Sequence, residues 1–100
     1  MNVAVAVVSL HLADNHSLKG KRGLLRSLQS RLRQRFNVAV AEVGAQDSHQ
    51  TAILGLCCVG SGSVHTEQAL DSALRFIEAE VVGLAEVVDC HTEVLSGFSD

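Results

Sequence analysis

Near the start of the chain, every second residue is apolar, and the residues between them form a second, mixed face. This period-two pattern predicts a β-strand over residues 2–12. One face of this strand carries Ala4, Ala6, Val8, Leu10 and Leu12. The other face carries Val3, Val5, Val7, Ser9 and His11. A polar break over residues 14–17 follows. Ser17 is a natural N-cap there, because its hydroxyl can accept a backbone N–H from a following helical turn.

After Ser17 the apolar spacing changes to three and four residues or multiples of these, which predicts a helix over residues 18–35. Its apolar stripe is Leu18, Leu25, Leu28 and Leu32. Residues 36–43 and 51–59 then read as two further strands. The polar segment 44–50 between them is short enough for a hairpin.

Glycines and serines at 60–63 predict a loop that ends in a second N-cap, Ser63, before another helix. The apolar stripe of that helix is Leu70, Ala73, Leu74, Ile77 and Val81. After Gly83, residues 84–95 predict a final strand.

This order of elements predicts an α+β fold of ferredoxin-like type, a two-layer βαββαβ sandwich with a four-stranded antiparallel sheet and two helices on one face. A chain of 100 residues has room for a single domain, with residues 1–96 folded and residues 97–100 as a mobile tail. The second face of the sheet stays open. Val3, Val5 and Val7 lie on it if their even-numbered neighbours pack against the helices. Exposed apolar patches usually have a partner, so we expect a homodimer or larger homo-oligomer through this open face.

Composition narrows the class of protein. A hydrophobic content of 47% with 19% charged residues argues against extended disorder. The three cysteines, with Cys57 and Cys58 adjacent, form neither an even disulfide framework nor a CxxC pair, which favours a reducing compartment. The apolar opening lacks a basic leader and is far shorter than the roughly 20 residues of a membrane span. We therefore expect a cytoplasmic protein without a membrane contact.

Charge is distributed unevenly behind a net value of −3. Seven of the eight basic residues lie within residues 19–35 with no acid among them, whereas residues 64–100 hold eight acids and only Arg75. The candidate anion- or RNA-binding residues are His16, Ser17, Lys19, Lys21, Arg22, Arg26 and Arg33. One helical stripe, away from the leucines, carries Lys19, Arg22, Arg26 and Arg33.

A basic stripe is most often a solvated polar face, and this interpretation stays open. Cations near a helix N-terminus, however, each oppose the macrodipole by roughly 0.3–1 kcal/mol, and Lys19, Lys21 and Arg22 lie there. A bound phosphate or carboxylate would relieve this conflict. Internal acids would relieve it equally well, and the candidates are Asp14, Glu42 and Asp47.

If the anion is nucleic acid, we expect recognition of phosphates and shape, with an affinity that falls steeply as salt rises. Base stacking is not expected. The chain has no Trp or Tyr, and the strand predicted over residues 51–59 lacks the aromatic residues that an RNA-recognition motif presents to single-stranded RNA.

Other chemistry-bearing residues are fewer. Asp89, His91 and Glu93 alternate onto one face of the last strand, an arrangement that fits metal binding or acid–base catalysis, but charges on an edge strand also prevent aggregation. Cys57 and Cys58 point to opposite faces of a strand, so they cannot jointly ligate one metal and read as buried small hydrophobes. Walker, GxSxG and GxGxxG motifs are absent, and no catalytic residue, metal site or cofactor is predicted.

Three segments carry a family resemblance: HSLKGKR at 16–22, LLRSLQSRLRQRFNVAVAEV at 24–43 and ALRFIE at 73–78. With Asp47 and Gln50 in the hairpin, they resemble the YlxP-like family of small bacterial proteins of unknown function. The resemblance implies a ferredoxin-like fold, a bacterial cytoplasm and no established catalytic activity. Members are often encoded beside translation-initiation and ribosome-maturation genes, which favours RNA or ribosome contact. The chain departs from the family's usual pattern at Gly20, Ala39, Ser48 and His49.

The leading hypothesis is a non-enzymatic, RNA- or ribosome-associated accessory factor. Phosphates are contacted through Lys19, Lys21, Arg22, Arg26 and Arg33, and His16 and Ser17 shape the start of the helix. The alternative is a small oligomeric domain that binds a ligand or a protein and has no nucleic-acid role. A concave pocket at a subunit interface, with the basic side chains paired to Glu42 or Asp47, would favour it. A third hypothesis is an enzyme built on Asp89, His91 and Glu93, which requires a bound metal or a cleft at that strand.

Overall fold

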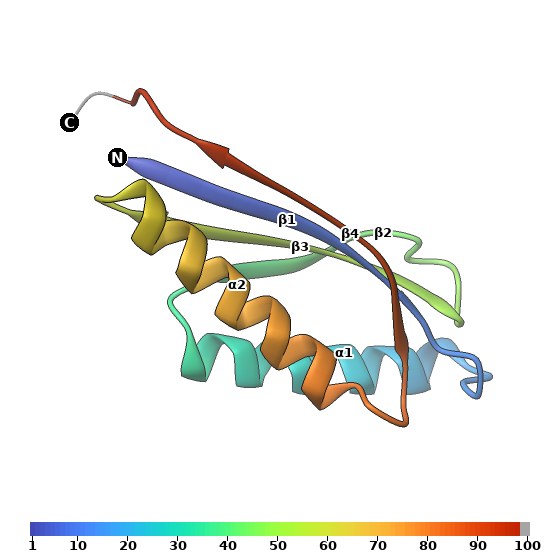
Figure 1. The fold of residues 1–100 in the computed structure, drawn as a ribbon. Helices are drawn as coiled ribbons and strands as arrows, with labels where there is room; N and C mark the ends of the chain where they lie inside the picture. The colour runs from blue at the N-terminus through green and yellow to red at the C-terminus, as the bar shows by residue number, and fades with distance from the viewer. Residues whose placement is uncertain (99–100) are drawn as a thin grey trace.

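The computed structural model describes residues 1–98 and shows a four-stranded antiparallel sheet with two helices on one of its faces (Figure 1). In chain order the elements are β1 (Asn2–His11), α1 (Leu18–Arg35), β2 (Ala39–Gly44), β3 (Thr51–Gly60), α2 (Ser63–Glu80) and β4 (Glu86–Leu95). Across the sheet the strands lie in the order β2-β3-β1-β4, each antiparallel to its neighbours. This is the ferredoxin-like βαββαβ arrangement that the sequence predicts.

The core lies between the sheet and the helices, and the even-numbered residues of β1 run through its middle. Ala4 and Leu10 are 0% exposed and Val8 is 1% exposed. They pack in one cluster with the buried leucines of α1 and the buried apolar stripe of α2. The odd-numbered residues of β1 consequently face away from the helices, and Val7 among them is 45% exposed. The predicted division of β1 between core and open face is confirmed.

The start of β2 differs from the prediction because Phe36 belongs to the end of α1. Its backbone N–H donates to the Leu32 carbonyl at 2.9 Å, which closes the last helical turn. Its ring packs edge-on against Phe76, with the ring centroids 5.5 Å apart. This packing between the two helices holds residue 36 out of the sheet, so β2 begins only at Ala39.

The ends of α2 also differ from the prediction. Its N-cap is Gly62, which has no capping side chain, and Ser63 is the first helical residue. At the other end, the Leu84 N–H donates to the Val81 carbonyl at 2.8 Å in a turn. This turn delays the start of β4 from residue 84 to Glu86.

Residues 1–98 include no helix that is both long and apolar enough to cross a membrane. The mobile tail predicted at 97–100 falls partly outside the described residues, because 99 and 100 are not described. In the described part, the Phe98 carbonyl accepts a hydrogen bond from the N-terminal amine of Met1 at 3.5 Å. The two ends of the described chain therefore lie close together.

Candidate anion-binding face of helix α1

Helix α1 begins as predicted, with Ser17 as its N-cap. Ser17 Oγ accepts a hydrogen bond from the Gly20 N–H at 2.9 Å. Asn15 Nδ2 donates to the carbonyl of Ser17 and to that of His49, which ties the start of the helix to the β2–β3 hairpin. A Cβ at Gly20 would collide with Asn15 Oδ1, so this glycine makes room for the protein's own side chain. His16, which precedes the cap, is exposed.

Lys21 lies inside the protein. Its side chain is 0% exposed, whereas every other basic residue of α1 is exposed. The Nζ ammonium donates to the Ala45 carbonyl at 2.8 Å, the Thr51 carbonyl at 3.1 Å and the Gln46 carbonyl at 3.5 Å. All three acceptors belong to the β2–β3 hairpin and the strand that follows it. Lys21 therefore fastens the first turns of α1 to that hairpin.

Glu42 on β2 balances the charge of Lys21. The Lys21 Nζ lies 2.9 Å from Glu42 Oε2. That oxygen is itself buried and accepts no hydrogen bond, so the contact is a close charge pair rather than an aligned hydrogen bond. An internal acid, rather than a bound anion, therefore balances the positive charge of Lys21. Lys21 is buried and fully engaged, and this corrects its place in the predicted anion-binding set.

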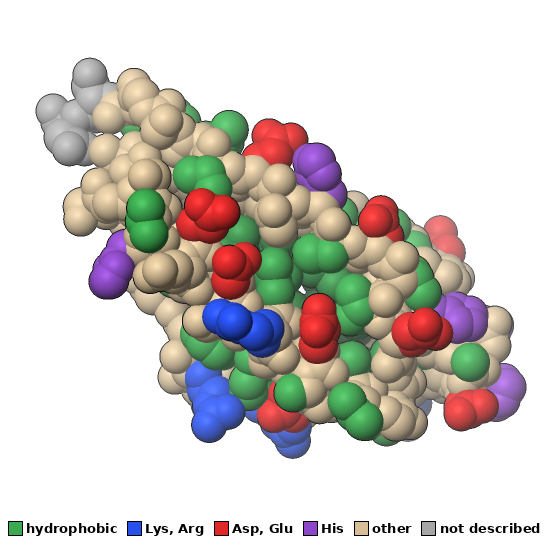
Figure 2. Space-filling view, viewed as in Figure 1, with side chains coloured by type: hydrophobic (Ala, Val, Ile, Leu, Met, Phe, Trp, Pro, Cys, Tyr) green, Lys and Arg blue, Asp and Glu red, His purple; other side chains and the backbone are tan. Residues whose placement is uncertain are grey.

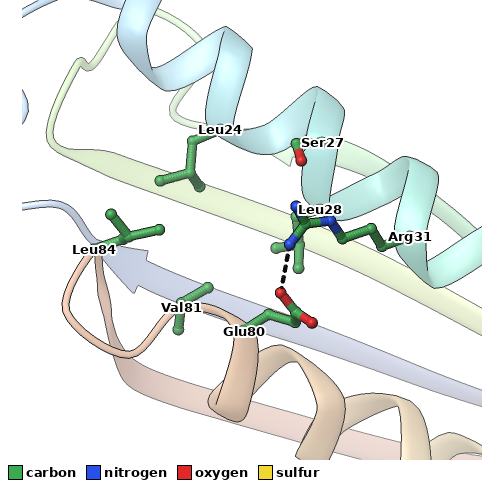
Figure 3. Close-up of a pocket in the computed structure, with 7 residues that line it drawn as sticks. All are labelled: Leu24, Ser27, Leu28, Arg31, Glu80, Val81 and Leu84. Atoms are coloured by element: carbon green, nitrogen blue, oxygen red, sulfur yellow. Dashed lines mark hydrogen bonds and ion pairs between the residues drawn. The ribbon is translucent and has the colours of Figure 1, made fainter.

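Arg31 bridges the two helices beside an apolar pocket (Figure 3). Its Nη1 lies 2.6 Å from Glu80 Oε2, and this pair stands at one side of the pocket. The pocket holds about 280 Å³ and is lined by Leu24, Ser27, Leu28, Arg31, Glu80, Val81 and Leu84. The two side chains are 58% and 28% exposed, so the pair contributes at most about 1 kcal/mol to stability. Glu80 nevertheless balances the positive charge of Arg31.

The other two arginines near the end of α1 also have internal partners. The Arg35 guanidinium lies 5.2 Å from the centre of the Phe76 ring, a cation–π contact. Arg33 Nη2 donates to the Val40 carbonyl at 2.8 Å and to Gln29 Oε1 at 3.3 Å. Neither of these arginines pairs with an acid among residues 1–98, so the positive charges of Arg33 and Arg35 are not balanced there while their positions are fixed.

Lys19, Arg22 and Arg26 are exposed and have no ion-pair or hydrogen-bond partner within residues 1–98. Arg22 and Arg26 line a cavity of about 260 Å³ between α1 and β2. The remaining lining residues are Leu25, Gln29, Arg33 and Glu42. Glu42 is the one acid among them, and it is already paired with Lys21. The three arginines of this cavity therefore face no unpaired carboxylate.

The structure brings part of the predicted set together and separates the rest. Arg22, Arg26 and Arg33 line the same cavity. The Ser17 hydroxyl, by contrast, accepts the hydrogen bond that caps the helix. Gln29 also lines this cavity and was not among the predicted residues. Its spacing of three residues from Arg26 and four from Arg33 places it on the same helix face, which is the signal that identifies it.

Asp89, His91 and Glu93 lie on the open face of the edge strand β4, as predicted, because the register pairs them with odd-numbered residues of β1. The His91 Nε2 lies 3.0 Å from Glu93 Oε1, and these side chains are 70% and 57% exposed. Residues 1–98 contain no group of three or more His, Cys, Asp or Glu that could hold a metal ion. The predicted alternation of Asp89, His91 and Glu93 is therefore present, on an edge strand that is exposed to solvent.

The adjacent cysteines take opposite faces of β3, and all three cysteines are free. Cys58 is buried, while Cys57 is only partly buried, so the prediction of two buried thiols holds for Cys58 alone. Burial, and then the neighbouring Cys57, raises the pKa of the Cys58 thiol. A raised pKa leaves less of the nucleophilic thiolate at neutral pH. Cys58 is a packing residue rather than an activated nucleophile.

Solved structures share this ferredoxin-like α+β fold at low sequence identity. The structure titled Putative Chlorite dismutase TA0507 matches with a TM-score of 0.60 and 10% identity, over 94% of this chain and 44% of that chain. SnoaB, a cofactor-independent oxygenase from Streptomyces nogalater, matches with a TM-score of 0.60 and 7% identity, over 100% of this chain and 97% of its own. The de novo designed protein Foldit4 matches with a TM-score of 0.53 and 12% identity, over 98% and 100%. These likenesses show the fold alone.

Sequence comparison identifies the family. Residues 3–92 match the family model described as "Protein of unknown function (DUF503)", so the chain belongs to this family. It is 39% identical over 66 residues to the Uncharacterized protein YlxP of Bacillus subtilis (strain 168), a match that covers 66% of this chain and 72% of that protein. The resemblance to the YlxP-like family is therefore confirmed. Neither description names an activity.

Proposed function

We propose that this protein is a non-enzymatic, RNA- or ribosome-associated accessory factor of the bacterial cytoplasm. Its contacts with phosphates come from Lys19, Arg22, Arg26 and Arg33 on α1. One observation carries the proposal. Within the described residues, Arg22 and Arg26 are free of internal partners, and they line a cavity whose one acid is already paired with Lys21. An anion in this cavity meets guanidinium groups without competition from an unpaired carboxylate.

The residue types suit a phosphate group. The planar guanidinium of arginine can donate two parallel N–H bonds to phosphate oxygens, a geometry that lysine lacks. Arg33 is held by the Val40 carbonyl, so part of the site is in place before an anion arrives. Lys19 extends the positive charge toward the N-terminus of α1, where the helix dipole also favours an anion.

The aromatic residues favour recognition of phosphates over bases. Phe36 and Phe76 pack against each other, and Arg35 covers the Phe76 ring. Both rings are half-buried and already in contact. Phe98, which is 47% exposed, follows β4 rather than α1, so no aromatic pair on α1 offers the stacking platform by which proteins usually hold single-stranded nucleic acid. Binding through phosphates alone is independent of sequence, and it weakens steeply as salt increases.

The test is co-sedimentation with ribosomes and their subunits at several salt concentrations, with Arg22→Gln/Arg26→Gln compared with Arg75→Glu. Both variants lower the net charge by two unit charges, but only the first removes charge from the cavity, because Arg75 lies on α2. We expect the wild type to associate with ribosomes in a salt-sensitive way. Arg22→Gln/Arg26→Gln should lose this association, and Arg75→Glu should keep it. Equal association of all three proteins, each still folded, would contradict the proposal.

We also propose, on a separate observation, that two copies of the chain associate through the open face of the sheet. Val7, Val43 and Val59 are 45%, 54% and 56% exposed. An apolar hollow of about 460 Å³ is lined by Val5, Ala6, Val7, Ala39, Val40, Ala41, Val43, Gly55, Leu56 and Cys57. A contiguous apolar surface of this kind supports self-association, because burying it removes apolar area from water.

Sedimentation velocity over a range of protein concentrations tests this association. Val7→Lys places a charge on the open face, and Val82→Lys places the same charge on the α2–β4 turn, where Val82 is 76% exposed. We expect Val7→Lys to be monomeric and Val82→Lys to keep the assembly of the wild type. A wild type that stays monomeric at all concentrations would rule the association out.

A further inference from the structure

The two edges of the sheet are protected to different degrees. At one edge, β2 is six residues long, and Arg33 of α1 donates to its Val40 carbonyl at 2.8 Å. At the other edge, the ten-residue β4 pairs with β1 and, within residues 1–98, with no other strand. A long edge with unpaired N–H and C=O groups is a template on which another strand can form. The outer side of β4 is such a template.

β4 is exposed on both of its faces. On the open face, Asp89, His91 and Glu93 are all exposed. On the face toward the helices, Cys90 is exposed and Val94 is 38% exposed, so α2 leaves this part of the strand uncovered. Acidic positions therefore alternate with less polar ones along the strand. A segment that pairs with β4 meets Asp89, His91 and Glu93 on the open face, and Cys90, Thr92 and Val94 on the face toward the helices.

Carboxylates from α2 add to the negative charge around β4. Burial, and then the carboxylates of Glu78, Asp89 and Asp71, raises the pKa of the Cys90 thiol, and Glu78 and Asp71 belong to α2. Figure 2 shows acidic side chains spread across the face that α2 and β4 form, with basic side-chain atoms among them and more along the lower border on the α1 side. The outer edge of β4 thus lies in a part of the protein that is rich in acidic residues, whereas α1 is basic.

A second copy of β4 paired in the register centred on His91 is a poor partner for this edge. Antiparallel pairing centred on His91 sets Asp89 of each copy opposite Glu93 of the other, and like charges directly opposite destabilise a strand pair. We propose that β4 instead accepts an extended, basic polypeptide segment as a fifth strand. Its lysine or arginine side chains face Asp89 and Glu93, and its alternate apolar side chains lie on the side of Val94. Main-chain hydrogen bonds supply the affinity and the alternation supplies the specificity. This docking is independent of phosphate binding by α1.

The test uses a capped heptapeptide of alternating lysine and valine, titrated into the isotope-labelled full chain while backbone amide shifts and hydrogen exchange are recorded. A glutamate–valine peptide controls for charge, and a lysine–valine peptide with alternate backbone N-methyl groups controls for strand pairing. Asp89→Asn/Glu93→Gln removes the facing acids. Asp14→Asn/Asp47→Asn changes the net charge equally at the loops near the start of α1.

We expect shifts and new amide protection within residues 89–95, no binding of the glutamate–valine peptide, and a clear loss with the N-methylated peptide. Asp89→Asn/Glu93→Gln should weaken binding by about threefold to tenfold, because two opposite-charge pairs are lost, while Asp14→Asn/Asp47→Asn leaves it unchanged. Equal binding of the N-methylated peptide, or equal loss in both variants, would overturn the proposal. Protection of residues 89–95 that grows with protein concentration in the Val7→Lys variant without peptide would also overturn it, since a second copy then occupies the edge rather than the open face.

Discussion

The Nζ of Lys21 lies 2.9 Å from the Oε2 of Glu42, and this pair joins α1 to β2 inside the protein. The same ammonium donates to carbonyl groups of the β2–β3 hairpin. A residue from the middle of the basic run is thereby part of the fold, while Lys19 and Arg22 on either side of it are exposed. The pair also removes the one carboxylate that would oppose an anion in the arginine-lined cavity.

Replacing Lys21 by methionine is expected to lower the free energy of unfolding by about 3 kcal/mol or more, because it leaves the Glu42 carboxylate without its counter-charge in a largely buried position. Urea denaturation followed by circular dichroism measures the change. The matched control is Lys19→Met, at an exposed position, which we expect to stay within about 0.5 kcal/mol of the wild type. Similar small effects at both positions would mean that the buried pair does not support the fold.

Two glycines of α1 should respond oppositely to alanine. Gly23 has open space where a Cβ would stand, so Gly23→Ala is expected to raise the free energy of unfolding by about 0.5–1 kcal/mol through helix propensity. At Gly20 the added Cβ collides with the Asn15 side chain, which then loses its hydrogen bonds to Ser17 and His49. We expect Gly20→Ala to bring no gain or a net loss. Thermal unfolding of the two variants distinguishes this account from one in which both glycines are merely unfavourable helix residues.

Cys90 should react slowly with iodoacetamide although it is exposed. Burial and the carboxylates of Glu78, Asp89 and Asp71 raise the pKa of its thiol above the ordinary value of 9.0, so a smaller fraction is thiolate at pH 8 than in a free cysteine. Alkylation of the native protein, located by mass spectrometry, gives the rate. Glu78→Gln should speed the reaction because it lowers the raised pKa. Glu67→Gln, also on α2, is the control, and an equal acceleration in both would show that the carboxylates named do not act specifically.

Much of the fold follows from local patterns in the sequence. The even and odd residues of β1 divide between core and solvent as their alternation predicts, and α1 begins and ends where its leucine spacing and Ser17 place it. The start of β4 differs because of a local turn between Val81 and Leu84, whereas the start of β2 depends on a contact distant in sequence. Phe36 stays out of β2 because it packs on Phe76, forty residues later, and nothing in residues 36–43 indicates that contact.

The candidate site was predictable only in part, for a similar reason. The stripe that carries Arg22, Arg26 and Arg33 follows from helical periodicity. The same periodicity also places Lys21 on the buried face of α1, four and seven residues before Leu25 and Leu28, a signal that its assignment to the anion-binding set overlooked. The sequence does not indicate the partners of Lys21, because three of them are backbone carbonyls, which any sequence supplies.

The most direct test of phosphate binding by α1 is the salt dependence of binding to a fluorescently labelled single-stranded RNA, measured by anisotropy. Each phosphate contact contributes roughly 0.7 to the slope of log affinity against log salt concentration, so Arg22→Gln/Arg26→Gln should reduce the slope by about 1.4. Arg75→Glu, with the same change in net charge, should keep the slope of the wild type. A slope that is unchanged in the double variant, or reduced equally in both, would contradict the role assigned to the arginine-lined cavity.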